Sequence, residues 1–135
     1  MTRHEARAKA LQALYQIDVG KAETMPAVVH VLEEDTPTDN DLRFIRRLVE
    51  GAVANTGEMD SWIEANVEGW QFDRIGRIER NVLRLSLYEL QHEHETDTAT
   101  ILNEAVELAK EYSGTASGKF VNGVLAKLLP LARPE

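Results

Sequence analysis

Apolar side chains recur every three to four residues along most of the chain, which is the spacing of amphipathic helices. The pattern predicts seven helices, over about residues 2–19, 24–34, 39–55, 59–67, 73–91, 98–112 and 118–129. We expect Gly20 to stop the first helix, a break near Gly69 to end the fourth, and Pro130 to end the last. Residues 113–118 are expected to form a turn. No alternating strand pattern occurs, so the fold class is predicted to be all-α, with helices packed as antiparallel hairpins.

The composition is typical of one packed domain. The chain has 135 residues, of which 43% are hydrophobic, and it contains no cysteine. The lack of cysteine excludes disulfide frameworks, thiol catalysis and thiolate metal sites. No apolar run approaches the ~18 residues of a membrane span, and the first residues carry no signal-peptide pattern. We therefore expect a cytoplasmic protein that does not contact membranes.

Acidic side chains dominate one stretch of the chain. The net charge is −8, and residues 21–72 carry four basic and eleven acidic side chains, whereas residues 1–20 have a net charge of +1. This balance argues against indiscriminate nucleic-acid binding, because neutralising phosphates supplies most of that affinity. It leaves room for a small basic site that is weak alone and sensitive to salt.

Sequence motifs for catalysis are missing. The chain has no glycine-rich phosphate loop and no nucleophile elbow, and no residues combine a nucleophile, a base and an orienting group. Residues 92–95 (His-Glu-His-Glu) are the only run that resembles metal ligands. Histidines two positions apart do not share a helix face, so a solvated linker is the favoured interpretation. We expect no enzymatic activity, no cofactor and no metal.

The first helix carries the strongest functional signal. On a helical wheel Arg7 falls between Leu11 and Leu14, and Arg3 lies one turn earlier. Two guanidiniums would thus extend the apolar seam, where they could bind phosphates and stack on bases, helped by the helix N-terminus. The alternative, a frayed and hydrated helix end, is the simpler interpretation of these residues alone.

The fifth predicted helix combines a basic face with unexplained acids. Its arginines at 77, 80 and 84 share one side, where a solvated charged face is the simplest expectation. Glu79 and Glu89 fall on its apolar arc, and buried acids need partners. Each could pair with an internal arginine or face a bound protein.

The last helix places a charge beside an aromatic ring. Lys119 and Phe120 stand at its predicted start, a combination used to bind single-stranded bases, and Asn122 lies with Lys119 on the polar side. The alternative is that Phe120 belongs to the core.

Four stretches, in order along the chain, resemble the NusB family of transcription antitermination factors. They are residues 6–15, 75–90, 103–110 and 119–125. The resemblance implies an all-α fold of two packed helical subdomains, about residues 1–56 and 57–131, within a single RNA-binding domain spanning 1–135. It implies a protein without catalytic activity.

The resemblance also implies partners. The family binds boxA, a short single-stranded RNA element of ribosomal RNA leader transcripts, together with the ribosomal protein NusE. The pair joins RNA polymerase and other Nus factors and suppresses termination. A homodimer that hides the RNA surface also occurs in the family.

Carried over by position, the resemblance assigns two sets of residues. Those implied in RNA binding are Arg3, Arg7, Lys9, Tyr15, Lys119, Phe120 and Asn122. Those implied in partner binding are Glu79, Arg80 and Tyr88. The chain departs from the family in two places: His4 and Glu5 dilute the basic start, and Asp97 stands where proline is common. The first departure favours a partner that supplies part of the RNA surface.

Two alternatives remain open at this stage. One is a helical protein–protein adaptor whose contact with RNA is incidental. The other is the NusB-like N-terminal module of an RNA cytosine methyltransferase, which we expect less because the chain to Glu135 leaves no room for a methyl-donor domain.

Overall fold

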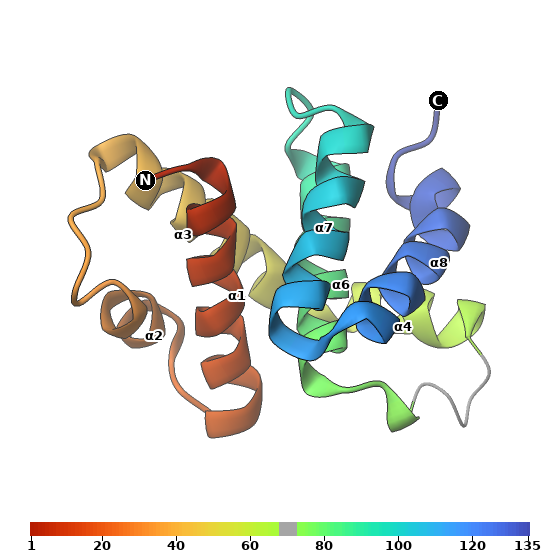
Figure 1. Ribbon diagram of the computed structural model, residues 1–135, viewed down its shortest axis with the longest axis horizontal. Coiled ribbons are helices and arrows are strands. Elements are labelled where there is room, and N and C mark those ends of the chain that lie inside the picture. Colours follow the sequence, from red (N-terminus) through yellow and green to blue (C-terminus); the bar gives the residue numbers. More distant parts are fainter. Residues whose placement is uncertain (68–72) are drawn as a thin grey trace. The chain divides into compact units, whose positions relative to one another are not determined.

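The computed structural model describes residues 1–67 and 73–135. Within these ranges the chain forms seven helices and no strand (Figure 1), which confirms the predicted all-α class. The chain divides into two compact units, Met1–Ala54 and Asn55–Glu135, each described separately below. The single RNA-binding domain with halves meeting near residue 56 remains a prediction. Among the described residues, no helix has the length and apolar character needed to cross a bilayer.

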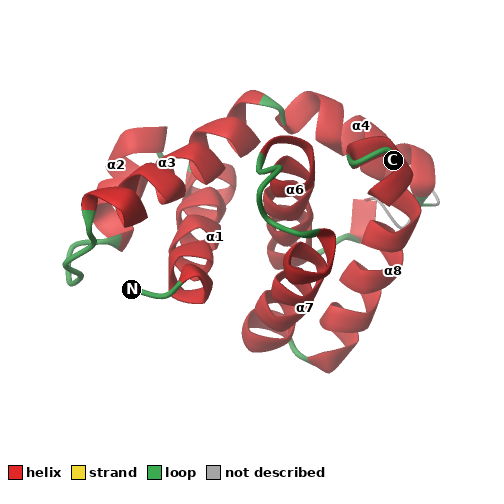
Figure 2. Cartoon of the chain, turned by 90° about the horizontal axis from the view of Figure 1, so that it is seen from above, coloured by secondary structure: helices red, strands yellow, loops and turns green. Residues whose placement is uncertain are grey.

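The first unit is a three-helix assembly in which α1 packs against both α2 and α3 (Figures 1 and 2). The helices are α1 (Arg3–Gly20), α2 (Thr24–Val31) and α3 (Asp39–Ala54). Small side chains on α1 allow close helix approach, and large apolar side chains on α3 fill the space. The buried residues include Ala6, Ala10, Leu11, Ala13, Leu14, Val28, Phe44, Ile45 and Leu48.

Reciprocal hydrogen bonds cap α1. Oγ1 of Thr2 accepts the backbone N–H of Glu5 at 3.0 Å, and the Glu5 carboxylate accepts the N–H of Thr2 at 3.4 Å. This capping box gives Glu5 a local structural role. At the other end Gly20 is the last helical residue, and Lys21 takes the left-handed conformation, with φ of 57°.

The start of α3 is held in the same manner. Thr38 donates its N–H to Oδ2 of Asp41 at 3.0 Å, and its Oγ1 accepts the N–H of Asp41 at 3.1 Å. The amino group of Met1 lies 3.3 Å from the same carboxylate oxygen. The hydrogen bond from the Thr38 backbone is the main cause that lowers the pKa of Asp41.

The second unit is built around α6. Its helices are α4 (Thr56–Asn66), α6 (Arg77–His92), α7 (Thr98–Ser113) and α8 (Thr115–Ala132). Helix α6 contacts α4, α7 and α8, and every residue from Asn81 to Leu90 is buried. The predicted end of the fourth helix near Gly69 lies outside the described residues.

Three predicted helix starts are wrong. Helix α4 begins at Thr56 and not at residue 59. Helix α6 begins at Arg77 and not at residue 73, because Gly76 is extended (φ −62°, ψ 155°) and serves as the N-cap. Helix α8 begins at Thr115 and not at 118. In place of the expected turn over residues 113–118, Gly114 alone connects α7 to α8. Its φ of 95° is a conformation that glycine adopts readily and that changes the direction of the chain.

Pro130 was expected to end the last helix, and this prediction is also wrong. The proline lies inside α8, which continues to Ala132. Proline removes its own N–H from the helical ladder and its ring crowds the carbonyl four residues earlier, so it disturbs the turn before it and not the turn after it. The following turn still closes, since the N–H of Arg133 donates to the carbonyl of Leu129 at 2.9 Å.

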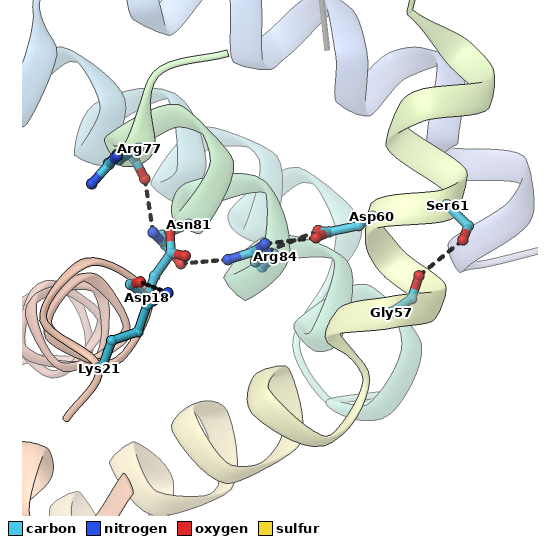
Figure 3. Close-up of polar contacts among 8 residues, drawn as sticks. All are labelled: Asp18, Lys21, Gly57, Asp60, Ser61, Arg77, Asn81 and Arg84. Atoms are coloured by element: carbon cyan, nitrogen blue, oxygen red, sulfur yellow. Dashed lines mark hydrogen bonds and ion pairs between the residues drawn. The ribbon is translucent and has the colours of Figure 1, made fainter. Parts of the chain in front are cut away.

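Arg84 corrects the prediction of a solvated arginine face on α6. The residue is buried, and its guanidinium forms a two-pronged pair with Asp60 on α4 (Figure 3). Nε lies 2.9 Å from Oδ1 of Asp60, and Nη2 lies 2.6 Å from Oδ2. Nη1 also donates to Oδ1 of Asn81 at 3.3 Å. Paired geometry of this kind fixes both distance and orientation, so the pair ties α4 to α6.

Arg133 closes the C-terminal end of α6. Its guanidinium donates to the carbonyl oxygens of Glu89 (3.3 Å), Leu90 (2.8 Å), Glu93 (3.0 Å) and Thr96 (2.7 Å). The last carbonyls of a helix lack intrahelical donors and carry partial negative charge. A cation from the end of α8 therefore caps α6.

We expect Asp60→Asn to lower the free energy of unfolding by about 2 kcal/mol, measured by urea denaturation. The change leaves the guanidinium of Arg84 buried without its counter-charge. The effect should be smaller than for a fully buried pair, because the Asp60 side chain is 26% exposed.

The control is Glu50→Gln, which removes an exposed pair with Arg46 on α3. This variant should stay within about 0.5 kcal/mol of the wild type. Equal losses in the two variants would contradict a special role for the Arg84–Asp60 pair.

The lowered pKa of Asp41 predicts acid sensitivity. A carboxyl with a lowered folded-state pKa adds stability above its unfolded pKa of about 3.9, and this contribution is lost as the pH falls through the folded value. Urea midpoints from about pH 5 to pH 2 should therefore fall less steeply in Asp41→Asn than in the wild type. Asp39→Asn, at an exposed position of the same helix, should follow the wild-type curve.

Candidate nucleic-acid interface

Three arginines surround one buried aromatic ring in the first unit. The Cζ atom of Arg3 lies 3.9 Å from the ring centroid of Phe44, and those of Arg7 and Arg47 lie 5.5 Å and 5.7 Å away. Arg3 and Arg7 are one turn apart on α1, and Arg47 follows Phe44 by nearly one turn on α3. We call these four residues the Phe44 cluster.

The Phe44 cluster holds positive charge in fixed positions. Guanidiniums over a ring face are attracted by its π electrons, which limits their motion. Arg3 and Arg47 are exposed, whereas Arg7 is only 4% exposed. The geometry therefore leaves Arg3 and Arg47 able to meet a phosphate, while Arg7 lies behind them against the ring.

The N-terminus of α1 offers less anion attraction than the sequence suggested. The capping box between Thr2 and Glu5 uses the N–H groups of both residues and places a carboxylate at the helix start. Positive potential in this unit therefore rests mainly on the guanidiniums.

Two further predicted RNA-binding residues of α1 lie apart from the Phe44 cluster. Lys9 pairs with Asp35 at 3.0 Å, and two positions after Arg7 it faces another side of the helix. Tyr15 is 37% exposed and lies about two turns beyond Arg7.

Lys119 and Asn122 line a groove between α7 and α8 in the second unit. The groove has a volume of about 440 Å³, and Lys110 and Asn103 also line it. Gly118 shapes the groove, since a Cβ at this position would lie 2.7 Å from Cγ of Lys110. The stem of Lys110 thus crosses α8 where the side chain is missing.

Phe120 faces a different hollow of about 410 Å³, which we call the Phe120 pocket. It is lined by the segment before α6, the start of α6, the end of α7 and the first turns of α8. Its polar members are Arg74, Glu79, Ser113 and Ser117. The structure therefore brings Phe120, predicted to bind RNA, together with Glu79, predicted to bind a protein partner.

The other two predicted partner residues are less accessible. Tyr88 is buried, and its ring lies 4.9 Å from that of His92. Arg80 is half-buried, and neither residue lines the groove or the pocket. Their role in partner binding stays a prediction.

The described residues contain no group of three or more histidine, cysteine, aspartate or glutamate side chains placed to hold a metal ion. The run over residues 92–95 contributes His92 to the aromatic contact with Tyr88.

A family model described as the NusB family matches residues 4–130, nearly the whole chain. The chain belongs to the NusB family. It is 40% identical over 130 residues to the transcription antitermination protein NusB of Listeria monocytogenes, a match that covers 96% of this chain and 98% of the relative. These matches confirm the predicted family and a transcription antitermination factor that is not an enzyme.

Solved NusB structures share the fold. The chain is similar to T. maritima NusB, with a TM-score of 0.88, 32% identity, and coverage of 96% of this chain and 91% of that one. It is also similar to a chain in a complex of the antitermination factors NusB and NusE with double-stranded RNA. That match has a TM-score of 0.86, 32% identity and coverage of 97% and 99%.

Sequence reasoning missed several residues that shape these sites in this NusB-family chain. Arg47 was not among the residues predicted to bind RNA, although its spacing from Phe44 could have indicated a shared surface. Gly76, Ser113 and Ser117 gave no signal, because their importance comes from side chains on other helices.

Proposed function

We propose that this protein binds single-stranded boxA RNA of ribosomal RNA leader transcripts together with the ribosomal protein NusE. The pair acts in the cytoplasm within an elongation complex of RNA polymerase and other Nus factors, where it suppresses termination. The Phe44 cluster is the observation that carries the RNA-binding part of this proposal. It concentrates three guanidiniums around one ring in a chain whose net charge is −8.

The charge distribution supports a requirement for the partner. Few phosphates can be neutralised by so small a basic site, so the affinity for RNA is low when the protein acts alone. A second protein extends the surface and raises the affinity. The similar NusB–NusE complex with RNA supports this arrangement. A homodimer of this chain would compete with it.

The proposed RNA contacts comprise two sets. On α1 they are Arg3, with Arg7 behind it against the Phe44 ring. Lys9 and Tyr15 take secondary positions, since Lys9 is paired with Asp35 and Tyr15 lies about two turns beyond Arg7. On α8 they are Lys119, Asn122 and Phe120. Lysine and asparagine side chains of the groove suit phosphate and base edges, and the Phe120 ring suits stacking. Glu79, Arg80 and Tyr88 are the proposed partner contacts.

The function is tested by titrating labelled boxA RNA with this protein, with NusE, and with both. We expect the mixture to bind at least about tenfold more tightly than either protein, and more tightly than it binds a scrambled RNA or a boxA duplex. Equal affinity for boxA and scrambled RNA would instead indicate an adaptor whose RNA contact is incidental.

Arg3→Ala should weaken binding of boxA RNA by the mixture about tenfold, because a charge-assisted contact to phosphate is lost. The slope of log affinity against log salt should also fall by about one. Arg3 is exposed and its guanidinium covers the Phe44 ring, so the thermal midpoint should fall by no more than a few degrees.

Arg46→Ala is the matched control. It removes the same charge from the same unit, at an exposed position paired with Glu50 and outside the Phe44 cluster. If both variants bind RNA equally, the Phe44 cluster is not the binding site.

A further inference from the structure

Arg3 and Arg47 reach the same aromatic ring from two different helices. Their Cζ atoms lie 3.9 Å and 5.7 Å from the ring centroid of Phe44, with Arg3 in the first turn of α1 and Arg47 on α3. Both arginines are exposed, whereas the ring that they share is 2% exposed. Residues far apart in the sequence thus bring two cationic groups to one place on the surface of the first unit.

The ring constrains the guanidiniums without using their hydrogen-bond donors. A guanidinium near an aromatic ring is attracted by the π electrons, and stacking on the ring involves its flat face. The N–H donors lie in the plane of the group and stay able to bind a ligand. Phe44 therefore limits the positions of Arg3 and Arg47 before any ligand arrives, which reduces the conformational entropy lost on binding.

Hydrogen bonds also fix the backbone from which these side chains start. The capping box of Thr2 and Glu5 fixes the first turn of α1, which carries Arg3. Hydrogen bonds between Thr38 and Asp41 fix the start of α3, about one turn before the aromatic ring. Fixed backbone and constrained side chains together are the features of a preorganised binding site.

We propose that Arg3 and Arg47 form a clamp that holds one phosphate of the RNA backbone, and that Phe44 is the positioning residue of this clamp. The proposal rests on the RNA-binding function proposed above and adds Arg47 and Phe44 to its residues. A phosphodiester carries one negative charge on two free oxygens, so each arginine can donate to its own oxygen. The clamp reads no base, and it sets where the RNA backbone lies on the protein.

A phosphate fits the clamp better than a carboxylate of a protein partner does. A carboxylate is planar, and the fork of a single arginine can bind both of its oxygens. The oxygens of a phosphate point to different sides, which suits two guanidiniums that come from different helices. The clamp also concentrates positive charge in a chain whose net charge is −8, so a polyanion is attracted to this place and not to the acidic remainder.

The test uses the full chain with NusE and single-stranded boxA RNA in which each phosphate in turn is replaced by an uncharged methylphosphonate. We expect the replacement at one position to weaken binding to the wild-type protein about tenfold, because the charge held by the clamp is lost. In Arg3→Ala and in Arg47→Ala, the penalty at that same position should fall to within about twofold, since the broken clamp no longer holds this phosphate.

A variant with both changes distinguishes one shared phosphate from two separate ones. If Arg3 and Arg47 bind the same phosphate, the double variant should lower the slope of log affinity against log salt by about one, as either single change does. Two separate phosphates would lower the slope by about two and give penalties at two positions, each lost in one variant. That result would overturn the clamp.

The role of the ring is tested with Phe44→Leu, which keeps an apolar side chain and removes the π electrons. This change should reduce the penalty at the clamped phosphate from about tenfold to about threefold or less. Ile45→Val trims the neighbouring buried residue and lowers the thermal midpoint, but it should keep the full penalty. Arg46→Ala, next to Arg47 in sequence and paired with Glu50, should also keep it. An equal loss of the penalty in Ile45→Val would show that it follows stability, and the positioning role would be overturned.

The outcomes separate this proposal from the function on which it rests. If boxA RNA binds with the expected specificity but no methylphosphonate position depends on Arg3 and Arg47, the clamp is overturned and the function stands. If boxA and scrambled RNA bind equally while one position depends on both arginines, the clamp stands and the specific function fails. If Arg47→Ala weakens binding of NusE without RNA, the two arginines hold a carboxylate of the partner and the proposal is overturned.

Discussion

A charge inside a helical core must have a counter-charge, and this constraint organises the second unit. Arg84 lies on the buried stretch of α6, where an unpaired guanidinium would be strongly destabilising. Both carboxylate oxygens of Asp60 accept hydrogen bonds from the Arg84 guanidinium. This pair of hydrogen bonds fixes the position of α4 on α6. At the end of the same helix, Arg133 satisfies backbone carbonyls in a comparable way and holds the end of α8. The apolar packing of α6 and its polar contacts with Asp60 and Arg133 therefore favour the same arrangement of α4, α6 and α8.

Positions without a side chain shape the hollows of this unit. Gly118 lets the stem of Lys110 cross α8 beside the groove, and Gly76 leaves room for the carboxylate of Glu79 beside the Phe120 pocket. The first turns of α8 therefore present different chemistry to the two hollows. Lys119 belongs to a polar groove, while Phe120 belongs to a pocket with apolar walls. One short helical segment can offer both a phosphate contact and a stacking surface.

Hydrophobic periodicity predicted the helices well because it reports which side of a helix is buried. It was least accurate where one residue interrupts a pattern that continues on both sides. Gly76 delays the start of α6, Gly114 replaces an entire expected turn, and Pro130 fails to end α8. The helical wheel also assigned Arg84 to a solvated face, because a wheel shows the direction of a side chain and not what another helix places there.

The sequence by itself determined the all-α class, the apolar seams and the family, since these depend on residues a few positions apart or on motifs in order. It also indicated that Arg3 and Arg7 continue the seam of the first helix. Only the tertiary structure decided which charged groups meet, as in Arg84 with Asp60 and Glu79 with Ser113. These partners lie 24 and 34 positions apart, on different helices. Such distances exceed the reach of any helical period, so their pairing follows from how the helices pack.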